Sequence, residues 1–423
     1  MRPLADRLWA RFFHASAFFA LFPGFATGGA LFAALSLGIP TGSQWELDAQ
    51  AHGHAEVFGW AGMLVIGVGY HFLPRLRGTA LALPGLASGS FWVLLFGLVA
   101  RILLEAIAAL RVSPALLPSA SAVELAGVTL ALIVLGRTFA GGPPVSTRAG
   151  YVAVRPFVLV SFASLWLSLA LDFLGLVATV AAPSTALPGW SRAASLDVAF
   201  AGFLVPIGIA MSARTFPLYF RARLPNQRVL RVGLGLAVGG LVLRLLGRLV
   251  GMPAVVGVGE VAGGIALVAL VLGLGIFAAR RPAARADVVR HSADPTEVLS
   301  VAAYVWLVVG ALILAVSGLG DLRILAVRVS GDALRHALGA GYVALLIFGV
   351  GGRLLPGFAN RPLRAERLVW ATLAFGLLAA LLRVAPGLVG VGDAGALLAG
   401  AGLFGMLGVA AFWWNVPATA RGR

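Results

Sequence analysis

The chain has 423 residues, of which 60% are hydrophobic and only 11% are charged, more apolar surface than a soluble protein of this length can bury. Cysteine is absent, which excludes disulfides, thiolate metal ligands, iron–sulfur clusters and haem attached through thioether bonds. The net charge of +16 comes from 32 basic residues that are all arginines, and because they lie between apolar stretches they indicate membrane topology, with no nucleic-acid partner.

Apolar stretches long enough to cross a bilayer, about 20 residues each, recur along the whole chain. Twelve can be marked in order, at residues 12–36, 51–74, 85–108, 120–139, 156–180, 195–217, 230–250, 254–279, 298–318, 333–356, 367–386 and 393–415. The first is too long for a cleavable signal and is expected to remain as a span. The longest interior connection, 280–297, is basic and polar and is interpreted as a linker. Residues 1–423 are therefore expected to form a single integral membrane domain of the all-α class.

Arginine is distributed unevenly between the two sides of the membrane. Connections on the side of the N-terminus hold twenty-three arginines, whereas the opposite side holds five: Arg111, Arg192, Arg323, Arg328 and Arg335. Because positively charged loops stay in the cytoplasm, this asymmetry predicts that both termini are cytoplasmic. The arginines also suit contact with anionic membrane lipid.

One segment occurs three times with the same pattern of residues. The copies begin at His54, Asp197 and His336, at intervals of about 140 residues. A glycine follows after five residues and a proline after twenty in each copy: Gly59, Gly202 and Gly341, and Pro74, Pro217 and Pro356. We interpret the glycines as points of close helix contact. Four spans per copy divide the chain into repeats at approximately 1–140, 141–285 and 286–423, which insert in the same direction around a pseudo-threefold axis along the membrane normal.

Histidine occupies the repeated position in the first and third copies. His54 and His336 are both expected near the outer surface, facing each other at one depth. Two imidazoles at one depth on facing helices can hold a haem iron, and an ionisable residue inside a span is a functional candidate by default. The alternative is a pair of interfacial histidines that hydrogen-bond to their neighbours.

Three other histidines are candidate metal ligands. His52 lies about 200° around the helix from His54 and is not expected to reach the same iron. It shares a face with Glu56, and the two would steer a second metal, carry protons or form a plain polar couple. His14 and His71 lie near the inner ends of the first two spans, where with a third group they would bind copper.

An arginine recurs in the third span of each copy, at Arg101, Arg244 and Arg383. Haem propionates are anions, and the planar guanidinium group suits carboxylates. Arg101 and Arg383, which belong to the copies with histidine, are therefore candidate haem-binding residues. The alternative is structural ion pairing, with Glu105 or Glu260 as partners.

Three segments resemble the NnrS family of bacterial membrane proteins. His52-Gly-His54-Ala-Glu-Val-Phe-Gly59 resembles its HxHEMxFG signature. His336-Ala-Leu-Gly-Ala-Gly341, followed by Gly352-Arg-Leu-Leu-Pro356-Gly, is similar to its HALTxGxxG…R helix. Ser212-Ala-Arg214-Thr-Phe-Pro217 looks like its GGRxxP span. The resemblance covers most of the chain and departs from the family where Ala55-Glu56 replaces Glu-Met.

This resemblance implies a haem protein of the bacterial inner membrane. Proteins of the NnrS type contain haem and copper and are linked to nitric oxide and nitrosative stress. The resemblance makes His52, His54 and His336 the metal-binding candidates, and the departure at Ala55-Glu56 puts the copper in question. Without cysteine for attachment, the haem would be of the b type.

A broader likeness is to subunit I of haem–copper oxidases and nitric oxide reductases, which also have twelve spans in a threefold array. In that fold the low-spin haem lies between histidines of spans two and ten, the positions of His54 and His336. The catalytic centre needs further histidines on spans six, seven and ten. This chain has Asp197 in span six and no histidine in span seven, so an enzyme is not favoured.

Three functions remain open at this point. The favoured one is a haem protein of the NnrS type that binds or senses nitric oxide or another small gas, or passes electrons from a periplasmic donor. The second is an oxidoreductase subunit of the nitric oxide reductase or terminal oxidase class. The third is a haem-free small-molecule transporter with a polar cavity lined by Asp197, Arg101 and Arg244.

Overall fold

The computed structural model describes residues 5–40, 42, 44–107, 113, 115–143, 149–180, 186–281, 294–327, 329–390 and 394–417. Within these ranges every regular element is a helix, and twelve helices are long and apolar enough to cross a membrane. The all-α polytopic fold predicted from composition is therefore confirmed. Arg111, Arg328 and most of the 280–297 connection lie outside the described residues.

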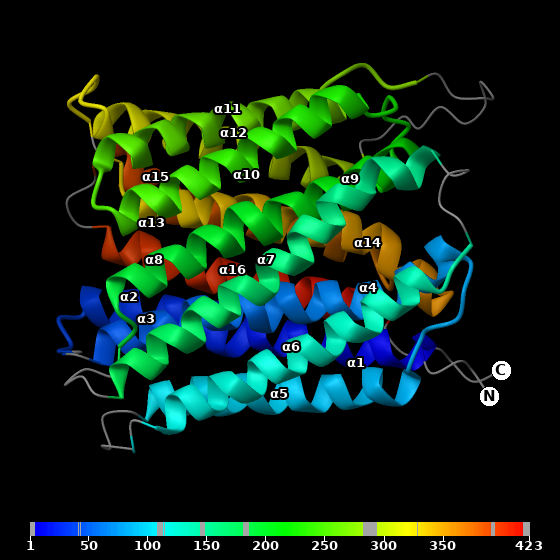
Figure 1. Cartoon of the computed structure of the whole chain (residues 1–423), viewed down its shortest axis with the longest axis horizontal. Coiled ribbons are helices and arrows are strands. Elements are labelled where there is room, and N and C mark those ends of the chain that lie inside the picture. The colour runs from blue at the N-terminus through cyan, green and yellow to red at the C-terminus, as the bar shows by residue number, and fades with distance from the viewer. Residues whose placement is uncertain are drawn as a thin grey trace.

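The helices run side by side along one long axis (Figure 1). In chain order they are α1 (Ala5–Phe19), η1 (Ala20–Ala26), α2 (Thr27–Ser36), α3 (Gln44–His54), η2 (Ala55–Gly62), α4 (Met63–Arg77), α5 (Pro84–Ala106), α6 (Leu116–Ala140), α7 (Ala149–Thr179), α8 (Gly189–Asp197), η5 (Val198–Leu204), α9 (Val205–Tyr219), α10 (Gln227–Leu249), α11 (Pro253–Leu274), α12 (Pro295–Asp321), α13 (Gly331–His336), η7 (Ala337–Ala344), α14 (Leu345–Ala359), α15 (Glu366–Val389) and α16 (Gly395–Asn415). The η elements are π-helical stretches that join the helices on either side of them into one continuous span.

Capping residues at the N-termini and glycines at the C-termini define many of the helix ends. Asn226, Asp294 and Ser330 cap α10, α12 and α13 with side-chain oxygens that accept backbone N–H groups at 3.1 Å, which satisfies donors that the first turn leaves unpaired. Gly78 and Gly275 follow α4 and α11 with φ angles of 65° and 62°. Glycine reaches this left-handed conformation without a Cβ clash and ends a helix there.

The spans that carry the repeated segment form the centre of the bundle. In the spans Gln44–Arg77, Gly189–Tyr219 and Gly331–Ala359, 78%, 67% and 67% of the apolar window is buried, against 22% to 50% in the other nine. The repeated glycines receive a side chain from the preceding span of their own copy, where an added Cβ would clash: Phe19 at Gly59, Ser164 at Gly202 and Trp306 at Gly341. The prediction that these glycines mark close helix contacts is confirmed.

Two structural features recur at the spacing of the predicted repeat. The third and fourth spans of each copy pack together as hairpins, α5 with α6, α10 with α11 and α15 with α16 (Figure 1). The stretches η2, η5 and η7 begin at the residue after His54, Asp197 and His336 respectively. Because η7 contacts both η2 and η5, the three stretches meet at the centre of the bundle. These features support a threefold repeat, whereas the symmetry axis and the likeness to haem–copper oxidases stay predictions.

The second span begins earlier than predicted. Its helix starts at Gln44, so His54 is the last of the 11 residues of α3, whereas His336 is the last of the 6 residues of α13. The two histidines therefore do not lie at the same distance from the start of their helices, and their equal depth in the membrane stays a prediction. The predicted span, 51–74, was chosen for its apolar residues and so left out Gln50. This residue is buried, and its Nε2 donates to Glu105 Oε1 at 2.7 Å.

Twelve spans place both ends of the chain on one side of the membrane, and the arginine asymmetry predicts that this side is the cytoplasm. The chain has no cysteine, so single-cysteine variants can be labelled without further changes. Ile39→Cys and Val327→Cys, both at positions 52% exposed, should react with a membrane-impermeant maleimide in intact cells. Leu224→Cys, at a position 75% exposed, should react only after permeabilisation. The reverse pattern would contradict the predicted orientation.

Candidate functional site

A cavity of about 410 Å³ lies among the central spans, at the end of the bundle away from the termini. Its lining includes His52, His54 and His336, together with Arg101 and Arg383. We call it the histidine cavity. The structure thus brings together the residues predicted to bind haem, in a volume within the 300–1,000 Å³ that is usual for ligand sites.

The walls of the histidine cavity include several aromatic side chains, and its charged groups are four arginines and the three carboxylates of Glu56, Asp172 and Asp332. The aromatic lining includes Phe25, Phe32, Trp60 and Phe200. Arg192 and Arg335 line it as well as Arg101 and Arg383. Such a surface suits a large, flat, apolar ligand that carries negative charges at its edge.

The His336 ring is held by the first turn of its own helix. Its Nδ1 lies 2.9 Å from the carbonyl oxygen of Asp332 and 3.3 Å from Asp332 Oδ1. Both oxygens only accept hydrogen bonds, so Nδ1 donates and Nε2 keeps its lone pair. Asp332 Oδ2 in turn pairs with Arg383 Nη2 at 2.8 Å, and the Arg383 guanidinium lies over the Phe32 ring. A carboxylate that orients a histidine in this way is a common support for a metal ligand.

The His52 ring is held by a kink in the first span. Pro23 and Gly24 lie in η1, where Gly24 has a ψ angle of −105° that departs from helical values and reorients its carbonyl group. The Gly24 carbonyl oxygen accepts a hydrogen bond from His52 Nδ1 at 2.9 Å. One turn later, Gly28 leaves room for the ring, since an added Cβ would lie 2.9 Å from His52 Cε1. The His52 Nε2 atom therefore also keeps its lone pair.

His52 and His336 lie opposite each other as a matched pair. Their ring centres are 6.3 Å apart and their planes differ by 7°. Two imidazoles that hold one metal from opposite sides have ring centres roughly 6 Å apart, because a metal–nitrogen bond is about 2 Å long and the nitrogen lies about 1 Å from the ring centre. Within the described residues, no protein group hydrogen-bonds to Nε2 of either ring. The distance between the two ring centres thus matches that of two imidazoles bound to one metal.

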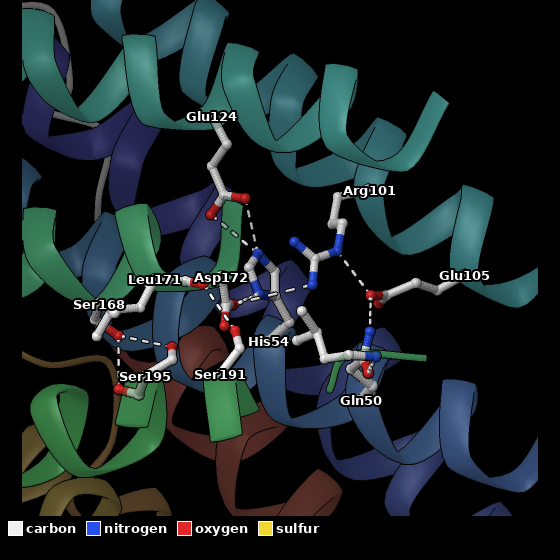
Figure 2. Close-up of polar contacts among 11 residues, drawn as sticks. Gln50, His54, Arg101, Glu105, Glu124, Ser168, Leu171, Asp172, Ser191 and Ser195 are labelled. Atoms are coloured by element: carbon white, nitrogen blue, oxygen red, sulfur yellow. Dashed lines mark hydrogen bonds and ion pairs between the residues drawn. The ribbon is translucent and has the colours of Figure 1, made fainter. Parts of the chain in front are cut away.

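His54 instead belongs to a buried network of charged groups (Figure 2). Its Nε2 lies 2.8 Å from Glu124 Oε2, and its Nδ1 lies 3.4 Å from Asp172 Oδ2. Arg101 Nε donates to Glu105 Oε1 at 2.7 Å, and Arg101 Nη2 lies 3.9 Å from Asp172 Oδ2. All five side chains are buried. Since both ring nitrogens of His54 face carboxylates, neither offers a lone pair to a metal.

Ligation of one iron by His54 and His336 stays a prediction. Among the described residues, the imidazole ring that lies parallel to that of His336 belongs to His52. The expectation that His52 and His54 point in different directions agrees with their different partners. The position of the His52 ring depends on its hydrogen bond to the Gly24 carbonyl oxygen in another span. The spacing of residues within one helix does not predict such a contact.

Sequence reasoning also missed Asp172. It is the sole acidic residue in the predicted 156–180 span, and a charged group inside a span is a signal of function or pairing. The hydroxyl groups of Ser168 and Ser191 donate to the carbonyl oxygens of Ser195 and Leu171, both at 2.8 Å (Figure 2). These bonds fix α7 against α8 and so place Asp172 beside His54.

Glu56 lines the histidine cavity but does not pair with His52 within the described residues. Its buried Oε1 atom has no hydrogen-bond partner there. Gly24 provides the space for this carboxyl group, because an added Cβ at that position would clash with Glu56 Oε1. The predicted His52–Glu56 couple is thus not formed directly.

His14 and His71 lie at the other end of the bundle. Trp413 Nε1 donates to Nδ1 of His14, which is exposed, at 2.9 Å. The buried His71 ring stacks on Phe358 with ring centres 3.8 Å apart. The described residues contain no group of three or more histidine, aspartate or glutamate side chains that could hold a metal ion. The structure therefore offers no third ligand for the copper site predicted at these two histidines.

The second copy carries charges at the equivalent place. Asp197 pairs with Arg244 Nη1 at 3.3 Å and with Arg248. These three residues and Glu260 line a separate cavity of about 250 Å³. Arg335 lines both this cavity and the histidine cavity. The recurring arginine is thus an ion-pair partner in all three copies, as the structural alternative predicted.

No protein-family model matches this chain, and no curated protein is significantly similar to it. The resemblance to the NnrS family therefore stays a prediction that rests on the sequence motifs.

The His54 network generates a prediction about stability. Glu124→Ala removes one carboxylate from the buried site that holds His54 and Arg101. Because breaking a buried ion pair costs about 3–5 kcal/mol, the free energy of unfolding should fall by about that amount. The matched control is Glu46→Ala, because Glu46 is 59% exposed and pairs with Arg192 at 3.6 Å, where a loss of about 0–1 kcal/mol is expected. Thermal unfolding of the purified variants measures the difference. Equal stability of the two variants would show that the network does not stabilise the fold.

Proposed function

We propose that this protein is a membrane haem protein of the NnrS type, in which His52 and His336 hold the iron inside the histidine cavity. The observation that carries the proposal is the matched pair of imidazoles, 6.3 Å apart and nearly parallel, each with Nδ1 bound to a backbone carbonyl group. This arrangement fixes the tautomer that presents Nε2 to a metal.

Haem fits the pair better than a bare metal ion does. Two histidines supply too few ligands for most protein-bound ions, and the described residues offer no cluster of three or more ionisable ligands. Haem brings four nitrogen ligands of its own and needs only one or two from the protein. The aromatic walls of the cavity suit its ring.

Arginines of the cavity would bind the haem propionates. Arg101 is fully buried, and its Nη1 and Nη2 atoms lack hydrogen-bond partners within the described residues. Arg383 lines the same cavity and is held in place by Asp332. Buried donors without partners are costly, so a carboxylate from the ligand would satisfy the free donors of Arg101, and Arg383 would add a second positive charge nearby.

Ligation by two histidines favours electron transfer. If His52 and His336 held the haem from its two sides, the iron would pass electrons and would offer no free place to a substrate. Nitric oxide would then bind only by displacing one imidazole, which would make the protein a sensor of the gas. In the proposed orientation, with cytoplasmic termini in a bacterial inner membrane, the histidine cavity faces the periplasm, where an electron donor could reach it.

The transporter alternative has one observation in its favour. The 250 Å³ cavity lined by Asp197, Arg244 and Arg248 is polar and separate from the histidine cavity. Arg101, which was expected to line the same cavity, lines the histidine cavity instead. An absorption spectrum of purified protein without a haem band would favour the transporter.

Variants of the three histidines test the proposed ligands. His52→Ala and His336→Ala should each remove or convert the low-spin haem spectrum, because the iron loses one axial ligand. His54→Ala should retain haem and its low-spin bands while lowering thermal stability, since His54 serves the buried network. His14→Ala is the control, because this exposed histidine lies at the opposite end of the bundle. Low-spin bands that survive in His52→Ala and vanish in His54→Ala would restore the pairing predicted from sequence.

Turnover assays test the oxidoreductase alternative. A nitric oxide reductase or terminal oxidase needs a second metal beside its haem, and enzymes commonly turn over about 1–1,000 times per second. We expect no sustained reduction of nitric oxide or oxygen in this range by purified protein supplied with an electron donor. Metal analysis should give iron without stoichiometric copper. Sustained turnover together with a second metal would replace the proposal with the enzyme.

A further inference from the structure

A second space, partly open at its edge, lies between the central spans, on the side of the bundle toward the termini. It has a volume of about 160 Å³ and is lined mainly by the later halves of the central spans, with side chains such as Leu64, Val68, Ile207, Ala210, Leu346 and Leu354. We call it the apolar cavity. Its lining contains a single charged residue, Arg214, whose side chain is exposed.

The apolar cavity and the histidine cavity meet at one ring of three side chains. Ala61, Leu204 and Val343 line both spaces. They occupy equivalent positions of the threefold repeat and come from η2, η5 and η7, the stretches that meet at the centre of the bundle. These three apolar side chains are the residues that line both cavities.

The chemistry of the lining selects one class of ligand. Water needs polar partners, so an apolar cavity of roughly 150 Å³ in a folded protein stays dry and takes up xenon or benzene instead. Ions and polar molecules would lose their hydration without compensation. A small uncharged molecule loses little hydration and gains dispersion contacts from the walls.

We infer that the apolar cavity is a binding site for a small uncharged apolar molecule of the size of a diatomic gas, held one ring of side chains away from the histidine cavity. The inference does not depend on haem, because none of the lining residues is a proposed ligand. They come mainly from α4, α9 and α14, with others from α6 and α7. If the proposed function holds, the site would concentrate a gas next to the iron.

Xenon is the probe, because it is uncharged, apolar and chemically inert. The full-length protein in detergent is titrated with xenon, and the ¹²⁹Xe NMR shift is followed against a detergent blank. We expect a saturable shift in the wild-type protein. Xenon-derivatised crystals should place the atom among α4, α9 and α14. The absence of a saturable shift, or a xenon atom bound only elsewhere, would overturn the inference.

Paired substitutions test the position of the site. Ala210→Phe places a ring in the cavity from a position that is 4% exposed and should abolish the saturable shift. Ala410→Phe adds the same ring at an exposed position of α16 and should retain it. Wild-type binding is read without either variant, so misfolding of Ala210→Phe leaves the inference testable. A protein that binds xenon but lacks haem would contradict the proposed function alone, and one that binds haem but no xenon would contradict this inference alone.

Discussion

The rest of this structure depends on the π-helical stretches η2, η5 and η7, where the three central spans widen by one residue per turn. Inside a bilayer every backbone group must find a partner within the protein, so irregular backbone is tolerated only where it is buried or lines a cavity. The stretches η2, η5 and η7 meet this condition, because they keep helical hydrogen bonding with longer steps, as from Met63 N–H to the Phe58 carbonyl oxygen. Each stretch shifts the register of the side chains that follow it. The histidine cavity and the apolar cavity lie on either side of the ring that these stretches provide.

Many charged groups within the bundle form ion pairs, and these pairs distinguish His54 from the other two histidines of the cavity. Glu124 and Asp172 engage both nitrogens of His54, so this residue serves the fold. His52 and His336 are bound only through Nδ1, so each can still bind a ligand through Nε2. A charged group in a membrane interior is costly unless it is paired, and the recurring arginine supplies a partner in each copy. The carboxylates of Glu124 and Asp172 thus engage His54, whereas backbone carbonyl groups hold His52 and His336.

The sequence predicted the features that depend on composition and periodicity. Twelve spans, their all-α class and the close contacts at Gly59, Gly202 and Gly341 follow from apolar length and spacing, and the structure confirms them. The cavity that unites the histidines with Arg101 and Arg383 was also within reach, because equivalent positions of a repeat gather at one place. The different hydrogen-bond partners of His52 and His54 were out of reach, since they depend on the direction of side chains and on the kink at Gly24 in another span. Asp172 could have been recognised as a lone acidic residue in an apolar span.

The central claim is that His52 and His336 together hold a haem iron, and the electron paramagnetic resonance spectrum of the oxidised, purified protein tests it most directly. Two strong nitrogen ligands give low-spin iron. Parallel imidazole planes also donate into the same iron d orbital and separate it in energy from its neighbour, which gives a rhombic signal. The 7° between the two ring planes therefore predicts a rhombic low-spin ferric signal that accounts for one iron per chain. A high-spin signal from five-coordinate iron, or a protein purified without iron, would contradict the account.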